Sequence, residues 1–258
     1  MPIRSISFTL ASIAAACTLG CGSGGGSDGG GSVSQLKSSG VATADLDAFF
    51  LVTADEPGQV EIFTVLKREL SFEMHPVALS DGDALDATGP DGHTRRLKRS
   101  LVFEEPHYIA EFETHPAEGL VEIGFRGTTV SVPLRPEFSV TAPTPGTVLG
   151  FQDDLEIEWT PAEPGKVMRI WMHRSCHKLA GGTVGTSTFV PAPDTGAFSY
   201  DMSLFSEATD PAIDTSKDCS LSLELERRAT TDISPPYKSF SGLEANQSRE
   251  VEGVTLTF

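Results

Sequence analysis

Short stretches of strictly alternating apolar and polar residues constrain the fold of this chain more than any other feature. Residues 155–160, Leu-Glu-Ile-Glu-Trp-Thr, place every second side chain on one face of an extended strand. Residues 220–226 repeat the pattern, with leucine at every second position. Clusters of Gly, Pro and Asp separate such runs, and no stretch keeps apolar residues at helical spacing for three turns. The pattern predicts an all-β sandwich or barrel.

A second module begins near residue 137. Residues 138–146, Phe-Ser-Val-Thr-Ala-Pro-Thr-Pro-Gly, resemble the first strand of many bacterial Ig-like and fibronectin type III-like domains. The resemblance covers architecture only and implies two tandem Ig-like antiparallel β-sandwiches. We place the first sandwich at residues 41–136 and the second at residues 137–258.

The chain opens with the order of an export signal. Arg4 supplies a positive charge, and residues 6–19 form an apolar run of about 14 residues, shorter than the ~20 that a membrane-spanning helix needs. Small residues precede two cysteines, Cys17 and Cys21. This arrangement resembles the signal of bacterial lipoproteins, whose cleavage leaves a cysteine that receives a lipid.

We assign residues 1–20 to the signal peptide and Cys21 to lipidation. Gly20 precedes this cysteine, as in the commonest lipoprotein signals, and a glycine tract follows it. Cys17, which follows three alanines, is the alternative, and a plain secretory signal cut after Ala16 is a third.

Residues 21–40 form the lipidated cysteine and a linker made mainly of Gly and Ser. Such a linker is predicted to behave as a disordered coil, reaching roughly 25 Å from the membrane. Gly22, in place of Asp, resembles lipoproteins sorted to the outer membrane. We therefore expect an exported protein anchored in the cell envelope, facing the periplasm or the surface.

The formal charge of −17 over 258 residues limits the partners of the chain. It argues against nucleic acid and against charge-driven binding to anionic lipid. The expected membrane contact is therefore the covalent lipid, and the remaining candidate partners are an envelope protein or a glycan. The sequence predicts no cofactor.

Cys176 and Cys219 are the two cysteines of the exported part, and we predict that they form a disulfide rather than two free thiols. Closing a loop of about 44 residues is worth roughly 4 kcal/mol in the chain-entropy model. The pattern departs from antibody domains, because Cys176 follows the strand of Trp171 while Trp159 lies on an earlier strand. Both tryptophans lie in alternating strands, where burial in the core is the default expectation, so the sequence alone does not distinguish an exposed sugar-binding stripe from core.

His173, His177 and Cys176 form the sharpest candidate metal cluster, with ligand types that zinc prefers. A disulfide would remove the thiolate, and an extended strand would hold the two histidines roughly 13 Å apart. We therefore expect solvent-facing histidines rather than a metal site.

Asp81, Asp83, Asp86 and Asp91 gather carboxylates that could hold calcium. The EF-hand loop needs glycine at its sixth position and glutamate at its twelfth, whereas glycine comes second here. A tight turn is the favoured interpretation.

Asp194-Thr195-Gly196 matches the tripeptide of aspartic proteases. No second copy supplies the paired carboxylate that shared-proton chemistry requires. We expect a turn here.

Residues 95–99, Arg-Arg-Leu-Lys-Arg, are a basic island in an acidic chain. The island could dock a phosphate or an acidic polysaccharide, or its charges could pair with neighbours such as Glu104 and Glu105. Pairing or solvation is the favoured interpretation.

The sequence carries no serine-hydrolase, zinc-protease, P-loop or dinucleotide-binding motif. We assign no catalytic residue and no metal ligand. The expected function is that of a lipid-anchored envelope protein with a non-catalytic binding or structural role. An accessory binder of carbohydrate or of an envelope partner is the alternative, ahead of a hydrolase built from loop residues.

Overall fold

A computed structural model describes residues 35–102, 104–113, 118–238 and 241–258. The predicted signal peptide, most of the linker and both candidate lipidation cysteines, Cys17 and Cys21, lie outside the described residues.

The described chain is built from β-strands and short 3-10 turns. The strands of its first half are β1 (Leu36–Lys37), β2 (Asp47–Thr53), β3 (Gln59–Leu70), β4 (Glu73–Ala78), β5 (Leu85–Thr88), β6 (Thr94–Arg96), β7 (Lys98–Val102), β8 (Glu105–Glu113), β9 (Gly119–Phe125) and β10 (Thr128–Leu134). Those of the second half are β11 (Ser139–Ala142), β12 (Val148–Gly150), β13 (Asp154–Thr160), β14 (Val167–His177), β15 (Thr183–Pro193), β16 (Ala197–Asp201), β17 (Cys219–Thr231) and β18 (Gly242–Thr257). The 3-10 turns are η3 (Ser38–Gly40), η4 (Thr43–Asp45), η5 (Met202–Leu204) and η6 (Ser206–Ala208). Among the helices of this part of the chain, none has the length and apolar character needed to cross a membrane.

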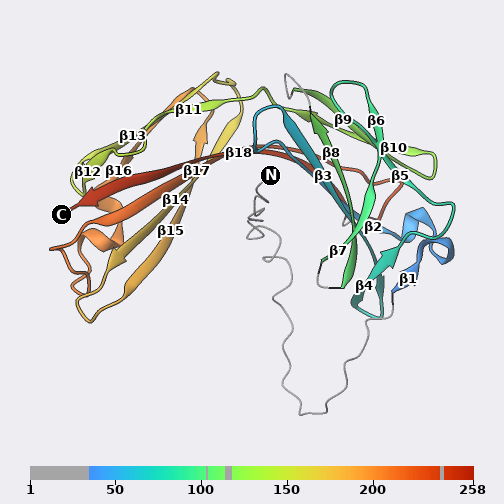
Figure 1. Ribbon diagram of the computed structural model, residues 1–258, viewed down its shortest axis with the longest axis horizontal. Helices are drawn as coiled ribbons and strands as arrows, with labels where there is room; N and C mark the ends of the chain where they lie inside the picture. Colours follow the sequence, from blue (N-terminus) through green and yellow to red (C-terminus); the bar gives the residue numbers. More distant parts are fainter. Residues whose placement is uncertain (1–34, 103, 114–117, 239–240) are drawn as a thin grey trace, which may run out of the picture. The chain divides into compact units, whose positions relative to one another are not determined.

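The strands form three sheets (Figure 1). The largest has 11 strands, with the main path β1-β4-β3-β2-β18-β17-β14-β15. A second sheet has the order β10-β9-β5-β6, and a third has the order β11-β13-β16. The predicted all-β fold is confirmed. Most neighbouring strands are antiparallel as predicted, but β18 runs parallel to β2 and to β12, and β1 runs parallel to β4.

The second sandwich is Ig-like. Strands β11, β13 and β16 form one sheet, and β12, β18, β17, β14 and β15 follow one another in the other. Numbered along the chain, this is the Ig arrangement, in which strands A, B and E share a sheet and strands G, F, C and C′ share the facing one.

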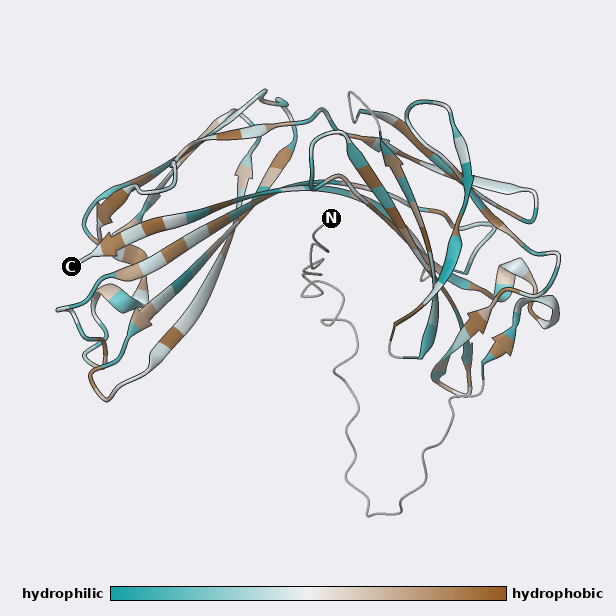
Figure 2. Cartoon of the chain, viewed as in Figure 1, coloured by the Kyte–Doolittle hydropathy of each residue, from teal (hydrophilic) through white to brown (hydrophobic). Residues whose placement is uncertain are grey.

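The period-two pattern explains the core of this sandwich. Met168, Ile170 and Met172 of β14 are fully buried against Leu155 and Ile157 of β13. Figure 2 shows the resulting alternation of hydrophobic and hydrophilic residues along the strands of this sheet. Each alternating strand therefore buries one face and leaves the other to solvent.

A second hydrophobic cluster fills the first sandwich, between the β4-β3-β2-β18 part of the large sheet and the β10-β9-β5-β6 sheet. Its members include residues far from the first sandwich in sequence. These are Ile233, Tyr237, Leu243 and Ala245, which come from the β17–β18 hairpin.

The division into domains at residues 41–136 and 137–258 stays a prediction. The core of the first sandwich nevertheless includes residues that come after position 136. β18 pairs with β2 through residues 242–246 and with β12 through residues 255–257. One hairpin thus contributes to both cores, which a strictly tandem arrangement would not require. The predicted linker also ends before residue 40, because Leu36 and Lys37 pair with β4.

The predicted disulfide joins Cys176, near the end of β14, to Cys219, the first residue of β17. Their Cα atoms are 4.4 Å apart and both residues are buried. The bond continues the β14–β17 ladder past the pair Ser175–Ser220. It therefore links neighbouring strands of one sheet, whereas the antibody disulfide links two facing sheets.

We expect that removing this disulfide, by replacing Cys176 and Cys219 together with alanine, lowers the free energy of unfolding by about 2–4 kcal/mol. The reason is that the bond restricts a chain segment of 43 residues in the unfolded state. Urea unfolding of the oxidised protein and of the double variant measures the difference. A reductant should leave the double variant unchanged, and two thiols open to alkylation in the unreduced folded protein would contradict the assignment.

Candidate functional site

The solvent side of the large sheet in the second sandwich carries a surface of aromatic and charged side chains. Because Met168, Ile170 and Met172 point into the core, the alternate residues of β14 point outward. We call this surface the Trp171 face. Its central residues are Arg169, Trp171, His173, Phe189 and Glu224.

The strand register brings these side chains together. Trp171 lies opposite Phe189 of β15 on one side and opposite Glu224 of β17 on the other. The ring centres of Trp171 and Phe189 are 4.7 Å apart, and the His173 ring lies parallel to Trp171 at 6.4 Å. Phe189 is 41% exposed. The result is a partly exposed aromatic surface that spans two paired strands.

Charged groups border the aromatic rings. The Arg169 guanidinium lies 5.3 Å from the centre of the Phe189 ring and forms an ion pair with Glu226 at 2.9 Å. Nε2 of His173 is 4.0 Å from a carboxylate oxygen of Glu224. Burial raises the pKa of Glu224, and the neighbouring Glu226 and Glu250 raise it further.

Two carboxyl groups of β17 border this surface. Glu224 and Glu226 point to the same side of β17, and burial raises the pKa of both carboxyl groups. The carboxylates can accept hydrogen bonds, while the rings offer flat apolar surfaces.

The residues of the candidate metal cluster do not come together on β14. His173 points to the Trp171 face, with Nδ1 2.8 Å from Oγ of Ser187, whereas Cys176 is in the disulfide and His177 is exposed at the end of β14. Among the residues that the structure describes, no three His, Cys, Asp or Glu side chains gather closely enough to hold a metal ion.

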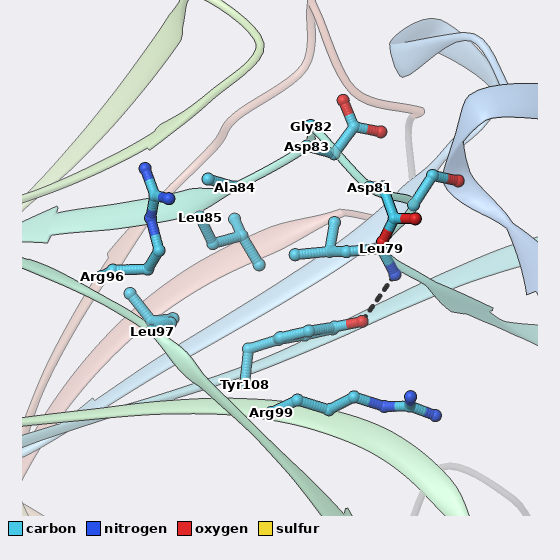
Figure 3. Close-up of a pocket in the computed structure, with 11 residues that line it drawn as sticks. Leu79, Asp81, Gly82, Asp83, Ala84, Leu85, Arg96, Leu97, Arg99 and Tyr108 are labelled. Carbon is cyan, nitrogen blue, oxygen red and sulfur yellow. Dashed lines mark hydrogen bonds between the residues drawn. The ribbon is translucent and has the colours of Figure 1, made fainter.

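A pocket of about 320 Å³ lies in the first sandwich, between the aspartate-rich loop and the basic island. Leu79, Leu85, Leu97 and Tyr108 form its apolar part (Figure 3). The Tyr108 hydroxyl accepts a hydrogen bond of 2.7 Å from the backbone N–H of Leu79, which fixes the ring against the wall.

Three of the four aspartates that could have held calcium have structural partners. Asp83 accepts hydrogen bonds from Arg126 at 2.9 and 2.5 Å, and these hold the pKa of Asp83 below its usual range. Asp86 pairs with Arg96, and Asp91 accepts from the N–H of His93 within its own turn. Three of the four candidate calcium ligands are therefore engaged within the protein, and the turn interpretation fits the geometry.

The basic island also pairs within the protein, as favoured from the sequence, but with other partners. Arg95 donates to the backbone oxygen of Glu111, Arg96 to Asp86 and Arg99 to Gln35. Figure 3 shows the guanidinium groups of Arg96 and Arg99 apart from one another and pointing in different directions. They do not form a clamp for one anion.

Asp194, the aspartate of the protease-like tripeptide, is buried in a structural network. Its carboxylate accepts from Nε1 of Trp159 at 2.6 Å and from Nε of Arg227 at 2.8 Å. The ion pair with Arg227 is almost fully buried. Asp194 therefore has a structural role in the second sandwich, and Trp159 belongs to the core of that sandwich.

Sequence reasoning missed Phe189 and Glu224, and it left the role of Trp171 open. One signal could have found the face. The alternate residues 168, 170 and 172 are all apolar, whereas Trp171 shares its side of the strand with Arg169 and His173. The more uniformly apolar side is the buried one.

Comparisons with known proteins add little to this site. No protein-family model matches the sequence, and no curated protein matches it. Among solved structures, the two tandem V-type regions of VCBP3, a v-region-containing chitin binding protein, match with 10% sequence identity and a TM-score of 0.18. The match covers 83% of this chain and 100% of that one. At that TM-score, the likeness supports no conclusion about this chain.

We predict that Glu224→Gln raises the melting temperature at pH 7, because the raised pKa of Glu224 shows that the ionised form is disfavoured in the folded state. A carboxyl group of this kind stabilises the fold when protonated, and that contribution is lost as pH rises through its folded-state pKa. The advantage of the variant should therefore shrink as pH falls toward the ordinary value of 4.5. Thermal unfolding of both proteins across this pH range measures the effect, and a gap that widens in acid would contradict it.

Proposed function

We propose that this chain is an exported, lipid-anchored protein of the cell envelope whose folded part binds a ligand without catalysing a reaction. The lipoprotein-like order of residues 1–21 supports export and anchoring through Cys21. The buried Cys176–Cys219 disulfide supports an oxidising compartment outside the cytoplasm.

The Trp171 face is the observation that carries the binding role. Apolar rings left on the solvent side of a sheet, over a filled core, are more typical of recognition surfaces than of folding requirements. Two other buried charged pairs have structural roles, Asp194 with Arg227 and Arg174 with Glu207. A binding module agrees with this distribution better than a hydrolase with a loop-built site.

A carbohydrate is the ligand class that the face favours over an envelope protein. The C–H faces of a sugar ring pack against aromatic rings, which are negative on their faces. Its hydroxyl groups can donate to Glu224 and accept from Arg169, and hydrogen bonds to charged groups are the stronger kind. Trp171 and Phe189 offer rings on adjacent strands, next to both charges.

We predict that Cys21→Ala abolishes labelling of the protein by an alkyne analogue of palmitate and releases it from the membrane fraction. The acyl chains that hold the protein are attached to this residue in our assignment, and two or more chains are needed for stable anchoring. In-gel fluorescence after metabolic labelling, with fractionation of the same cells, measures both effects.

Cys17→Ala is the matched control and should leave labelling and membrane association unchanged. Loss of labelling in this variant alone would move the anchor to Cys17. Export without labelling of the unaltered chain would reject the anchor.

We predict that Trp171→Ala weakens binding to an envelope glycan about tenfold or more, a loss of about 1.4 kcal/mol. The probes are purified peptidoglycan sacculi, tested by co-sedimentation, and neutral, acidic and amino-sugar oligosaccharides, tested by titration calorimetry. Phe72→Ala is the control, because Phe72 is 96% exposed but lies in the turn between β3 and β4. Binding that is equal in the two variants would place the glycan elsewhere, and no binding to any probe would reject the carbohydrate ligand.

A further inference from the structure

β15 ends the path of the large sheet on the side of the second sandwich (Figure 1). It pairs with β14 along its whole length, from Thr183 to Pro193. Within the residues that the structure describes, no strand pairs with its other side. One side of this strand therefore offers backbone groups to a further strand.

The first eight residues of β15 lack the features with which proteins usually protect such an edge, whereas its last three include Pro191 and Pro193. Natural sheets keep exposed edge strands short, or place charges and proline on them. Other edges in this chain follow that rule: β6 is short and carries two arginines, β7 begins with lysine and arginine, and β10 contains Pro133. Residues 183–190, Thr-Val-Gly-Thr-Ser-Thr-Phe-Val, contain no charge and no proline.

The ladder with β14 shows which backbone groups face the open side. Hydrogen bonds from the N–H of Lys178 to Gly182 and from the N–H of Asp194 to Lys166 flank the ladder. Both bonds join residues with even numbers, and hydrogen-bonded pairs alternate with non-hydrogen-bonded pairs along an antiparallel ladder. The even residues of β15 therefore bond to β14, and the odd residues Gly185, Ser187 and Phe189 direct N–H and C=O groups outward.

This edge is complementary to a second copy of itself. When two β15 strands run antiparallel with Ser187 opposite Ser187, Gly185 of each copy lies opposite Phe189 of the other. These are the residues with open backbone groups, so each pair can exchange two hydrogen bonds. A Cβ placed on Gly185 would have only one neighbour within 4 Å, at 3.9 Å, so there is room for the Phe189 ring beside it. Aromatic side chains stabilise edge glycines in this way.

The pairs of this register out to residues 184 and 190 are compatible as well, and the pairing ends there because Thr183 would lie opposite Pro191, which has no N–H to donate. Thr186 lies opposite Thr188, and Val184 opposite Val190. Threonine pairs and β-branched pairs are favourable across strands, and no like charges meet.

We propose that two copies of this chain associate through β15, antiparallel about a two-fold axis at Ser187, so that the large sheet continues from one copy into the other. An interface of this kind is isologous, since residue i meets residue j and j meets i. The net charge of −17 per chain opposes association at long range, while the edge itself is uncharged. Salt should therefore strengthen the dimer by screening that repulsion.

The first test replaces Ser187 with cysteine in the full chain. Residues opposite one another in a bonded antiparallel pair have Cα atoms about 5.5 Å apart, within the range that a disulfide spans. We expect Ser187→Cys to form a covalent dimer under mild oxidation, seen on a non-reducing gel. Glu158→Cys is the control, since Glu158 is exposed on the central strand β13. Equal dimer formation by the two variants, or none by Ser187→Cys, would overturn the proposal.

The second test places a charge on the edge. Ser187 points to solvent and its N–H faces the open side, so Ser187→Asp should fold normally, with an unchanged circular dichroism melt. Two aspartates would then meet at the axis, and we expect the dissociation constant to rise at least tenfold in sedimentation equilibrium. A parent protein that stays monomeric at low and high salt would reject the dimer, and a Ser187→Asp variant that dimerises equally would place the interface elsewhere. Neither measurement involves the lipid or a glycan, so its failure is distinct from failure of the proposed function.

Discussion

The junction of the two cores depends on one buried charge pair. Arg227 of β17 and Asp194, which directly follows β15, have side chains that are 2% and 0% exposed. Removing two charges from water is costly unless the surroundings satisfy their hydrogen bonds. Here they do, because Arg227 also donates to the backbone oxygens of Pro136 and Pro161, and Asp194 also accepts from Trp159. The loss of any one partner would leave a buried polar group unsatisfied.

The same network fixes the segment between the sandwiches. Arg227 holds Pro136, Arg249 donates to the backbone oxygens of Phe138 and Ala54, and Gln247 donates to that of Arg135. All three donors come from the β17–β18 hairpin, which also contributes to both hydrophobic clusters. The hairpin therefore joins the two sandwiches by hydrogen bonds and by shared packing. A Gly/Ser-type linker between independent domains would show neither feature.

The period-two alternation predicted much of the fold because burial of one strand face requires every second residue to be apolar, and this pattern is visible within a few adjacent residues. The strands around Trp159 and Leu221–Leu225 have the expected inward sides, and Cys176 pairs with Cys219 as expected. The sequence did not predict the shared hairpin, because pairing between β2 and β18 joins residues nearly 200 positions apart, such as Phe49 and Gly242. Local patterns carry no information about such contacts.

Partners of charged groups were missed for the same reason. Arg126 reaches Asp83 across 43 residues, and Arg227 reaches Asp194 across 33. The local candidates for the basic island, Glu104 and Glu105, were close in sequence but do not pair with it; Glu105 instead pairs with Lys67. The candidate site could not be predicted for a similar reason. The Trp171 face combines rings from β14 and β15 with carboxylates from β17, which are separated in the sequence.

The Trp171 face and the β15 edge are coupled by the geometry of a strand. Side chains alternate between the two faces of a sheet, and backbone groups alternate between its two neighbours, both with a period of two. In β15 the residues whose side chains point outward, Ser187 and Phe189, are therefore the same residues whose backbone groups are open. An axis at Ser187 would keep the outward sides of both copies on one side of a continuous sheet. Two Trp171 faces would then point the same way, at a fixed spacing. For a polymeric glycan, the second contact would be intramolecular, and affinity would rise without any new type of contact.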